Sequence, residues 1–186
     1  MPRLGGGPVR AAGWLAVAGL ALAGCASGGG ASTGGNYVGG TVGLECAPFA
    51  RALTGVRLSG DAADWWPEAQ GRYQRASTPA PGSVLVLKRE GRLPYGHVAV
   101  VSKVLSAREI LVTQANWVHH RVTEDQPVVD VSILNNWSVV RMYWPPSGQL
   151  GGHEYPAYGF IRPERALSHE EIAAGTPRAI RLATGG

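Results

Sequence analysis

A single cysteine, Cys46, stands in the stretch "GLECAPFARALTG" (residues 43–55), where a helix is expected to begin. Phe49 and Leu53 follow it at i+3 and i+7 on one helical face, and Gly55 would end the helix. At a helix N-terminus the free amide dipoles favour negative charge, so we expect this thiol to form the nucleophilic thiolate more easily. A buried, inert cysteine, or one that pairs between chains, is the alternative.

A nucleophilic cysteine needs a general base, and the base needs a group that orients it. Of the five histidines, only His97 opens a strand pattern, "GHVAVVSKV" (residues 96–104). A second strand pattern, "EILVTQANW" (residues 109–117), carries Gln114 and Asn116 two residues apart and therefore on one face. The two segments predict a hairpin that brings an imidazole beside a polar group. Taken alone, His97 could also be a half-buried histidine bonded to a backbone carbonyl.

The other histidines predict no metal site. His119 and His120 follow the second strand pattern without an Asp, Glu or Cys at metal-ligand spacing. His153 and Glu154 lie in a loop rich in Gly, Pro and Tyr, as a surface pair or as part of a cleft rim. We expect neither a metal nor another cofactor.

The N-terminal segment, residues 1–24, has the pattern of a signal peptide, with two arginines followed by an uncharged apolar run. This run is shorter than the roughly 20 residues of a transmembrane helix. The tetrad "LAGC" resembles the bacterial lipobox, which implies lipidation of Cys25 and anchoring of the mature domain to a membrane. Ordinary secretion, with cleavage after the Ala-rich segment, is the alternative. Ala26 after Cys25, instead of aspartate, implies an outer-membrane location in the cell envelope, facing the periplasm.

The composition after the leader separates a tether from a folded domain and argues against nucleic-acid binding. Residues 25–40 are small and Gly-rich, as in a flexible tether. The full chain has 17 basic and 13 acidic residues, and removal of Arg3 and Arg10 with the leader leaves 15 against 13. No basic block or stripe accompanies this weak positive charge, so we expect no nucleic-acid partner.

Strand patterns dominate the proposed folded domain, residues 41–163. Besides the two strands of the hairpin, they cover residues 82–88 and the stretches "VVDVSIL", "WSVVRMYW" and "YGFIRP". One or two helices precede them. We therefore predict an α+β fold, with N-terminal helices packed on an antiparallel sheet of about five or six strands.

The C-terminal segment, residues 164–186, begins with a helix signal. Ser168 and Glu171 form a capping-box pattern, and Gly175 would end a short helix. The residues that follow, "TPRAIRLATGG", lack a pattern. We expect a short helix and a loose tail.

The order and spacing of these segments resemble the CHAP domain, a papain-like family of bacterial cysteine amidases and endopeptidases that act on peptidoglycan. The likeness rests on "ECAPFAR", "DAADWWPEA", "PAPGSVLVL", "GHVAVV" and "QANW". It implies a papain-like fold, with Cys46 as the nucleophile and His97 as the general base. It also implies peptidoglycan as the partner, cut at a stem-peptide or sugar–peptide amide through a thioester on Cys46.

Tryptophans near these motifs are candidates for the walls of the site. Trp65 and Trp66 pack under the helix, or else Trp66 faces the cleft and contacts glycan or stem peptide. Trp117, next to the orienting strand, is a similar candidate.

The resemblance has one departure at the orienting strand. Many CHAP domains carry a glutamate and, two residues on, an asparagine; here Asn116 matches the asparagine and Gln114 replaces the glutamate. A neutral amide can orient an imidazole but cannot stabilise an imidazolium as a carboxylate does, so we expect a weaker ion pair. The alternative function is a weak or inactive CHAP scaffold that binds peptidoglycan or recruits another hydrolase.

Overall fold

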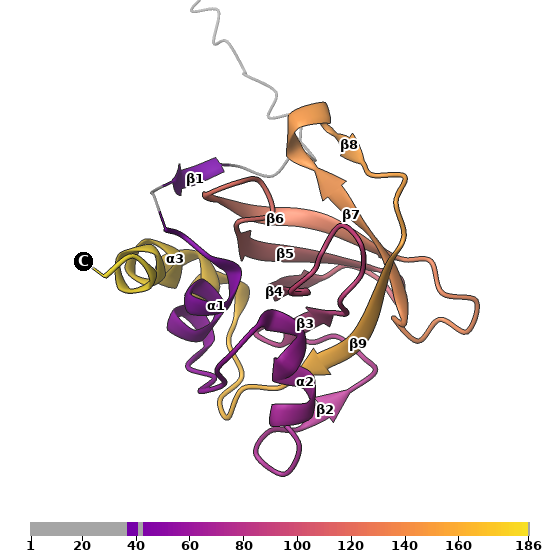
Figure 1. Cartoon of the computed structure of the whole chain (residues 1–186), viewed down its shortest axis with the longest axis horizontal. Coiled ribbons are helices and arrows are strands. Elements are labelled where there is room, and N and C mark those ends of the chain that lie inside the picture. Colours follow the sequence, from indigo (N-terminus) through magenta and orange to yellow (C-terminus); the bar gives the residue numbers. More distant parts are fainter. Residues whose placement is uncertain (1–36, 41–42, 186) are drawn as a thin grey trace, which may run out of the picture. The chain divides into compact units, whose positions relative to one another are not determined.

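The computed structural model describes residues 37–40 and 43–185 (Figure 1). The expected signal peptide, residues 1–24, and the expected lipidation site, Cys25, lie outside the described residues. Among the described helices, none combines the length and the apolar character that crossing a membrane requires.

Six antiparallel strands form a closed barrel at the centre of the domain. Along the ring, each of these strands pairs with the next, and pairing of β6 with β7 closes it. In ring order the strands are β3 (Val84–Leu87), β4 (His97–Val104), β5 (Glu109–Ala115), β6 (Arg121–Asp130), β7 (Val139–Trp144) and β9 (Tyr155–Ile161). With the helices beside it, this barrel gives the predicted α+β class, and it is consistent with a papain-like fold.

Three short strands extend the barrel at its edges. β2 (Arg75–Ala76) pairs with β9, and β8 (Gln149–Leu150) pairs with β7. β1 (Tyr37–Gly40) pairs with β6. The assignment of residues 37–40 to a flexible tether was therefore wrong, because the exposed edge of β6 offers backbone hydrogen bonds to this segment despite its two glycines.

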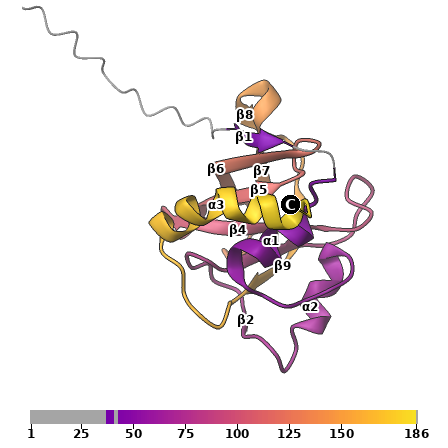
Figure 2. The same cartoon turned by 90° about the vertical axis from the view of Figure 1, so that its left-hand side faces the viewer.

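The helices gather on one side of the barrel, as the two views show (Figures 1 and 2). There α3 (His169–Ala183) lies beside α1 (Cys46–Thr54). The other helical segments are short: η1 (Ala62–Asp64), α2 (Trp65–Glu68) and η2 (Pro145–Ser147).

Strand β3 shows why a barrel strand can have a sequence that is apolar at every position. Its four residues are all buried, but they face two different cores. Val84 and Val86 pack with the helices, whereas Leu85 and Leu87 pack inside the barrel. Because both faces of the strand are covered, period-two alternation of polar and apolar residues is absent from the sequence.

The helix α3 is longer than the sequence predicts. The capping box of Ser168 and Glu171 is present, but the helix continues through Gly175 and Pro177 to Ala183. A Cβ atom on Gly175 would lie 3.1 Å from Leu53 Cδ1. This glycine therefore permits close packing of α3 on α1, and the prediction that it ends the helix before a loose tail was wrong.

The strand predicted from "VVDVSIL" ends early. Strand β6 stops at Asp130, and the apolar residues Ile133 and Leu134 lie in the following turn, 96% and 78% exposed. The predicted segment is therefore displaced: it continues past the end of β6 at Asp130 and omits the first part of the strand, residues 121–127.

Candidate active site

The first turn of α1 presents Cys46 to solvent. Cys46 is the first residue of the helix, and the preceding Glu45 has the extended backbone of an N-cap residue. The helix ends at Gly55, whose φ of 76° is left-handed, as the sequence predicts. Cys46 is a free, half-buried cysteine. Its amide is among the first of the helix, which have no partner within the helix itself.

His97 lies at the start of β4, after a glycine that the packing requires. Gly96 has a φ of 71°, and a Cβ atom there would lie 2.7 Å from both Ala63 Cβ and the Leu87 carbonyl oxygen. No other residue fits this position without displacing η1 or β3. Gly96 thus lets the chain enter β4 directly under η1, and this fixes the place of His97.

Gln114, near the end of β5, orients the imidazole of His97. His97 Nε2 lies 2.9 Å from Gln114 Oε1. Because a carbonyl oxygen only accepts, Nε2 carries the proton and donates it, and Nδ1 keeps its lone pair. Both side chains are buried, at 3% and 1% exposure. This tautomer is the one that a general base needs, with its free nitrogen turned away from the orienting group.

Asn116 has a different set of partners. It lies just past the end of β5 with a φ of 59°, so it does not share the strand face of Gln114 as the sequence predicts. Its Nδ2 donates to Glu45 Oε2 at 2.6 Å, and its Oδ1 accepts from the His120 amide at 2.8 Å. The left-handed backbone, which asparagine tolerates, breaks the alternation of the strand. Asn116 therefore ties the end of β5 to the N-cap of α1.

A cleft of about 560 Å³ contains Cys46, His97 and Asn116 together. We call it the Cys46 cleft. Its other walls come from the start of α1, from the loop before η1 and from the loop before β4, including Arg92 and Tyr95. Tyr95 is 66% exposed and stands on the rim. Gln114 lies behind His97, outside the lining of the cleft.

Burial keeps both partners in their neutral forms. It raises the pKa of the Cys46 thiol, and the nearby Glu45 carboxylate raises this pKa further, although backbone hydrogen bonds, above all at Val98, oppose the shift. Burial also lowers the pKa of His97 to about 4, and the hydrogen bond to Gln114 opposes this only in part. Desolvation, the largest cause, therefore opposes the lowering of this pKa that the helix N-terminus predicts, and the net shift is upward.

The two candidate wall tryptophans lie in different places. Trp117 packs against His97, with 5.1 Å between the ring centroids, and its Nε1 donates to the Tyr143 carbonyl. Trp66 stacks on Tyr158 at 5.7 Å, with Arg75 over its ring at 5.0 Å. The structure does not place Trp66 in the lining of the Cys46 cleft.

Sequence reasoning missed the four charged residues that line the cleft: Glu45, Arg51, Asp61 and Arg92. Glu45 was overlooked because only the helical face that follows Cys46 was considered. Arg92 lies five residues before His97 in "GRLPYGH", just ahead of the strand pattern that begins at Gly96. A charged residue in a loop next to a candidate base is the signal that could have identified it.

Comparison with protein families points to the same segment of the chain. Residues 35–116 match the family described as "CHAP domain", and this range includes Cys46, His97, Gln114 and Asn116. CHAP domains are typically hydrolases, of amidase or peptidase type, and peptidoglycan is the substrate class that the family suggests. The match supports a CHAP domain in this part of the chain.

Comparisons with individual proteins add little. No curated protein matches the chain significantly. A solved structure described as "The crystal structure of Ly7917" is 15% identical over 71% of this chain, with a TM-score of 0.34. The chain covers 57% of the length of that protein.

Proposed function

We propose that this chain is a peptidoglycan hydrolase that cleaves a stem-peptide or sugar–peptide amide bond with Cys46 as its nucleophile. The observation that carries the proposal is the shared cleft of Cys46 and His97, with His97 held through Nε2 by Gln114. The CHAP match over the same residues supports the substrate class.

In the proposed acylation step, Cys46 Sγ attacks the amide carbonyl carbon while His97 Nδ1 accepts the thiol proton. The carbonyl oxygen becomes an oxyanion, for which the backbone N–H of Cys46, in the first turn of α1, is a candidate donor. The tetrahedral intermediate collapses with cleavage of the C–N bond, and His97 gives its proton to the departing amine. The acyl group remains on Cys46 as a thioester.

In the proposed deacylation step, His97 Nδ1 accepts a proton from a water molecule that attacks the thioester carbon. The C–S bond then breaks, the acid product leaves, and the proton returns from His97 to Cys46. Both groups are neutral at the start, so the proton moves during the attack and no thiolate–imidazolium pair forms beforehand. Gln114 holds the imidazole in place but adds no negative charge to stabilise the imidazolium.

The second candidate is a scaffold that binds peptidoglycan or recruits another hydrolase with little or no turnover. Two observations favour it: the pKa of Cys46 is raised while that of His97 is lowered, and the described residues contain no hydrogen bond between the two side chains. Hydrolysis remains the leading proposal, because catalytic hydrogen bonds are often long without substrate.

Digestion of purified sacculi by the full chain separates the two candidates. Wild type and Cys46→Ala would be compared at pH 7, with released fragments identified by mass spectrometry and bound protein measured by sedimentation. The hydrolase releases fragments only with Cys46 present, and their ends identify the bond cut. Equal sedimentation of both proteins with no fragments from either would favour the scaffold.

The proposal for location is a lipid anchor on Cys25 at the outer membrane, facing the periplasm. Its support is the leader, the apolar run and the "LAGC" tetrad. Mass spectrometry of the chain isolated from membranes would detect the acyl groups. Cys25→Ser should release the protein from the membrane, and retention of this variant would contradict the anchor.

A further inference from the structure

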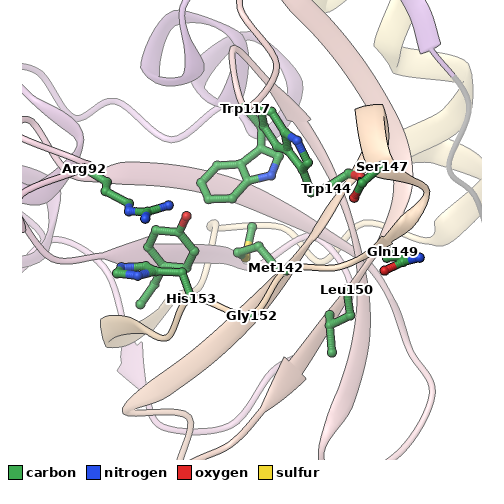
Figure 3. A pocket seen from close by; sticks show the side chains of 11 residues that line it. Arg92, Trp117, Met142, Trp144, Ser147, Gln149, Leu150, Gly152 and His153 are labelled. Atoms are coloured by element: carbon green, nitrogen blue, oxygen red, sulfur yellow. The ribbon is translucent and has the colours of Figure 1, made fainter.

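A second cavity, of about 430 Å³, shares Arg92 with the Cys46 cleft. Figure 3 shows the side chains that line it. We call it the Arg92 pocket. Three aromatic side chains form its walls: Trp117, Trp144 and Tyr155. The Trp117 ring meets both others nearly edge-on, with centroids 6.5 Å from Trp144 and 5.2 Å from Tyr155. Such walls bind apolar parts of a ligand.

Two residues connect the Arg92 pocket with the Cys46 cleft. Arg92 lines both cavities. Trp117 lines the pocket on one side and packs against the His97 ring on the other. A substrate that extends past His97 from the cleft would therefore reach this pocket.

The proposed chemistry determines which part of the substrate would reach the Arg92 pocket. His97 gives its proton to the departing amine, so the amine nitrogen must lie next to the imidazole in the transition state. The part of the substrate attached to that nitrogen then continues past His97 and Trp117. The Arg92 pocket thus lies on the leaving-group side of the bond, and this assignment rests on the proposed function.

Arg92 gives the pocket a positive charge. Its guanidinium points into the space between Trp117 and His153 (Figure 3). Arg92 forms no ion pair within residues 37–40 and 43–185. The Glu90 carboxylate faces His153, with its Oε2 3.5 Å from His153 Nε2. A planar guanidinium with free donors is suited to a carboxylate.

We propose that the Arg92 pocket binds the leaving peptide of the substrate and that Arg92 pairs with a carboxylate of this peptide. The aromatic walls pack against its apolar atoms. His153, which faces Glu90, lines the same pocket. A saccharide would use the aromatic walls but would leave the charge of Arg92 unpaired, and for this reason we favour the peptide.

Binding without turnover tests this pocket. The full chain with Cys46→Ala would be titrated with three probes: the dipeptide alanyl-D-glutamate, its fully amidated analogue, and N-acetylglucosamine. Two-dimensional NMR would follow the indole N–H signals of Trp117 and Trp144. We expect the carboxylate dipeptide to shift both signals and to bind about tenfold more tightly than its amide.

Three arginine variants in the same background identify the group responsible. Arg92→Ala should abolish the preference for the carboxylate dipeptide, and Arg92→Lys should retain part of it. Arg178→Ala removes another exposed arginine, on α3, and should retain the full preference. The pattern of indole signals in each variant reports whether its fold is unchanged.

Several outcomes would overturn the proposal. They are no binding by the dipeptide, equal binding of dipeptide and amide, or a preference that survives in Arg92→Ala. Larger indole shifts with N-acetylglucosamine than with the dipeptide would assign the pocket to a saccharide instead. If the chain never digests sacculi but still shows an Arg92-dependent preference for the carboxylate, the proposed ligand of the pocket stands and the proposed hydrolase activity does not. The two proposals can therefore fail separately.

Discussion

His97 and His169 lie in different surroundings, although each contacts a polar side chain. His97 is buried beside a neutral amide and lines a large cleft with a thiol. His169, at the start of α3, contacts Asp125, with its Nε2 3.0 Å from Oδ2, at a surface where both side chains are partly exposed. By residue type alone, the second site has the stronger partner for a histidine.

The order of bonds at the second site prevents nucleophilic chemistry. Ser102 Oγ donates to Asp125 Oδ1 at 2.6 Å, so the carboxylate lies between the hydroxyl and the imidazole of His169. The base therefore cannot take the proton of the hydroxyl. The cavity there is about 10 Å³, roughly enough for a single water. At His97 the orienting Gln114 instead leaves the other ring nitrogen free, and the adjoining cleft of about 560 Å³ has room for a substrate.

The largest expected effect separates the two histidines by activity. His97→Ala removes the proposed general base of the Cys46 cleft and should lower sacculus hydrolysis by about 10³-fold or more. His169→Ala, the matched control, should stay within about twofold of wild type. Circular dichroism would establish that both variants fold. Comparable losses in the two variants would show that the contrast between the regions is wrong.

A second expected effect is a loss of stability in acid that depends on His97. Its pKa is about 4 in the folded chain and about 6.5 when unfolded, so the unfolded state takes up the proton first as the pH falls. The contribution of His97 to the unfolding free energy is fully present above about pH 6.5, and about 3 kcal/mol of it is lost by pH 4.

Denaturant unfolding of wild type and His97→Gln at pH 7 and pH 4 measures this contribution. The fall in stability between the two pH values should be smaller by about that amount in the variant, whereas His169→Gln should behave like wild type. An unchanged pH dependence in His97→Gln would mean that His97 titrates normally in the folded chain.

A smaller effect is expected from the partner of His97. Gln114→Glu puts a carboxylate at the imidazole and should raise the pKa of His97, which stabilises the protonated ring. The acid limb of the kcat/KM profile should move upward from near pH 4, and Gln114→Ala should lower kcat by about tenfold to a hundredfold. A limb that stays in place in Gln114→Glu would mean that residue 114 does not contact the base.

The smallest effect concerns the start of α3, beside His169. Ser168 Oγ accepts from the Glu171 amide at 3.2 Å, and Glu171 Oε2 accepts from the Ser168 amide at 2.8 Å. Ser168→Ala should cost about 1 kcal/mol of unfolding free energy without altering hydrolysis. Thermal unfolding with a parallel activity assay would measure both, and a loss of activity greater than the unfolded fraction would give this region a role in the chemistry.

Local patterns in the sequence were sufficient for the elements of the site. The period of α1, its end at Gly55 and the strand that starts at His97 all follow from residues within one segment. The hairpin of β4 and β5 was also predictable, because a short connection joins two strand patterns. The closure of the barrel was not, since it requires pairing of β6 with β7 and of β3 with β9, over long separations.

The wrong predictions concern residues whose structural role is set by tertiary contacts. In the sequence, Gly175 predicts the end of a helix, but in the fold the helix continues and Gly175 permits close contact with Leu53. The sequence predicts that Asn116 shares a strand face with Gln114, but its backbone is left-handed and its side chain bonds to Glu45. The position of Cys46 at a helix N-terminus predicts a lowered pKa, whereas burial raises this pKa in the folded chain. Each of these depends on neighbours that are distant along the sequence.

The central claim is that Cys46 carries an acyl group during the reaction, and rapid quenching in acid tests it most directly. The full chain would be mixed with soluble peptidoglycan fragments, quenched within milliseconds to seconds, digested with a protease and analysed by mass spectrometry. The account predicts a thioester on the peptide that contains Cys46, absent in Cys46→Ala and accumulating before the acid product appears. Turnover that persists in Cys46→Ala would contradict it.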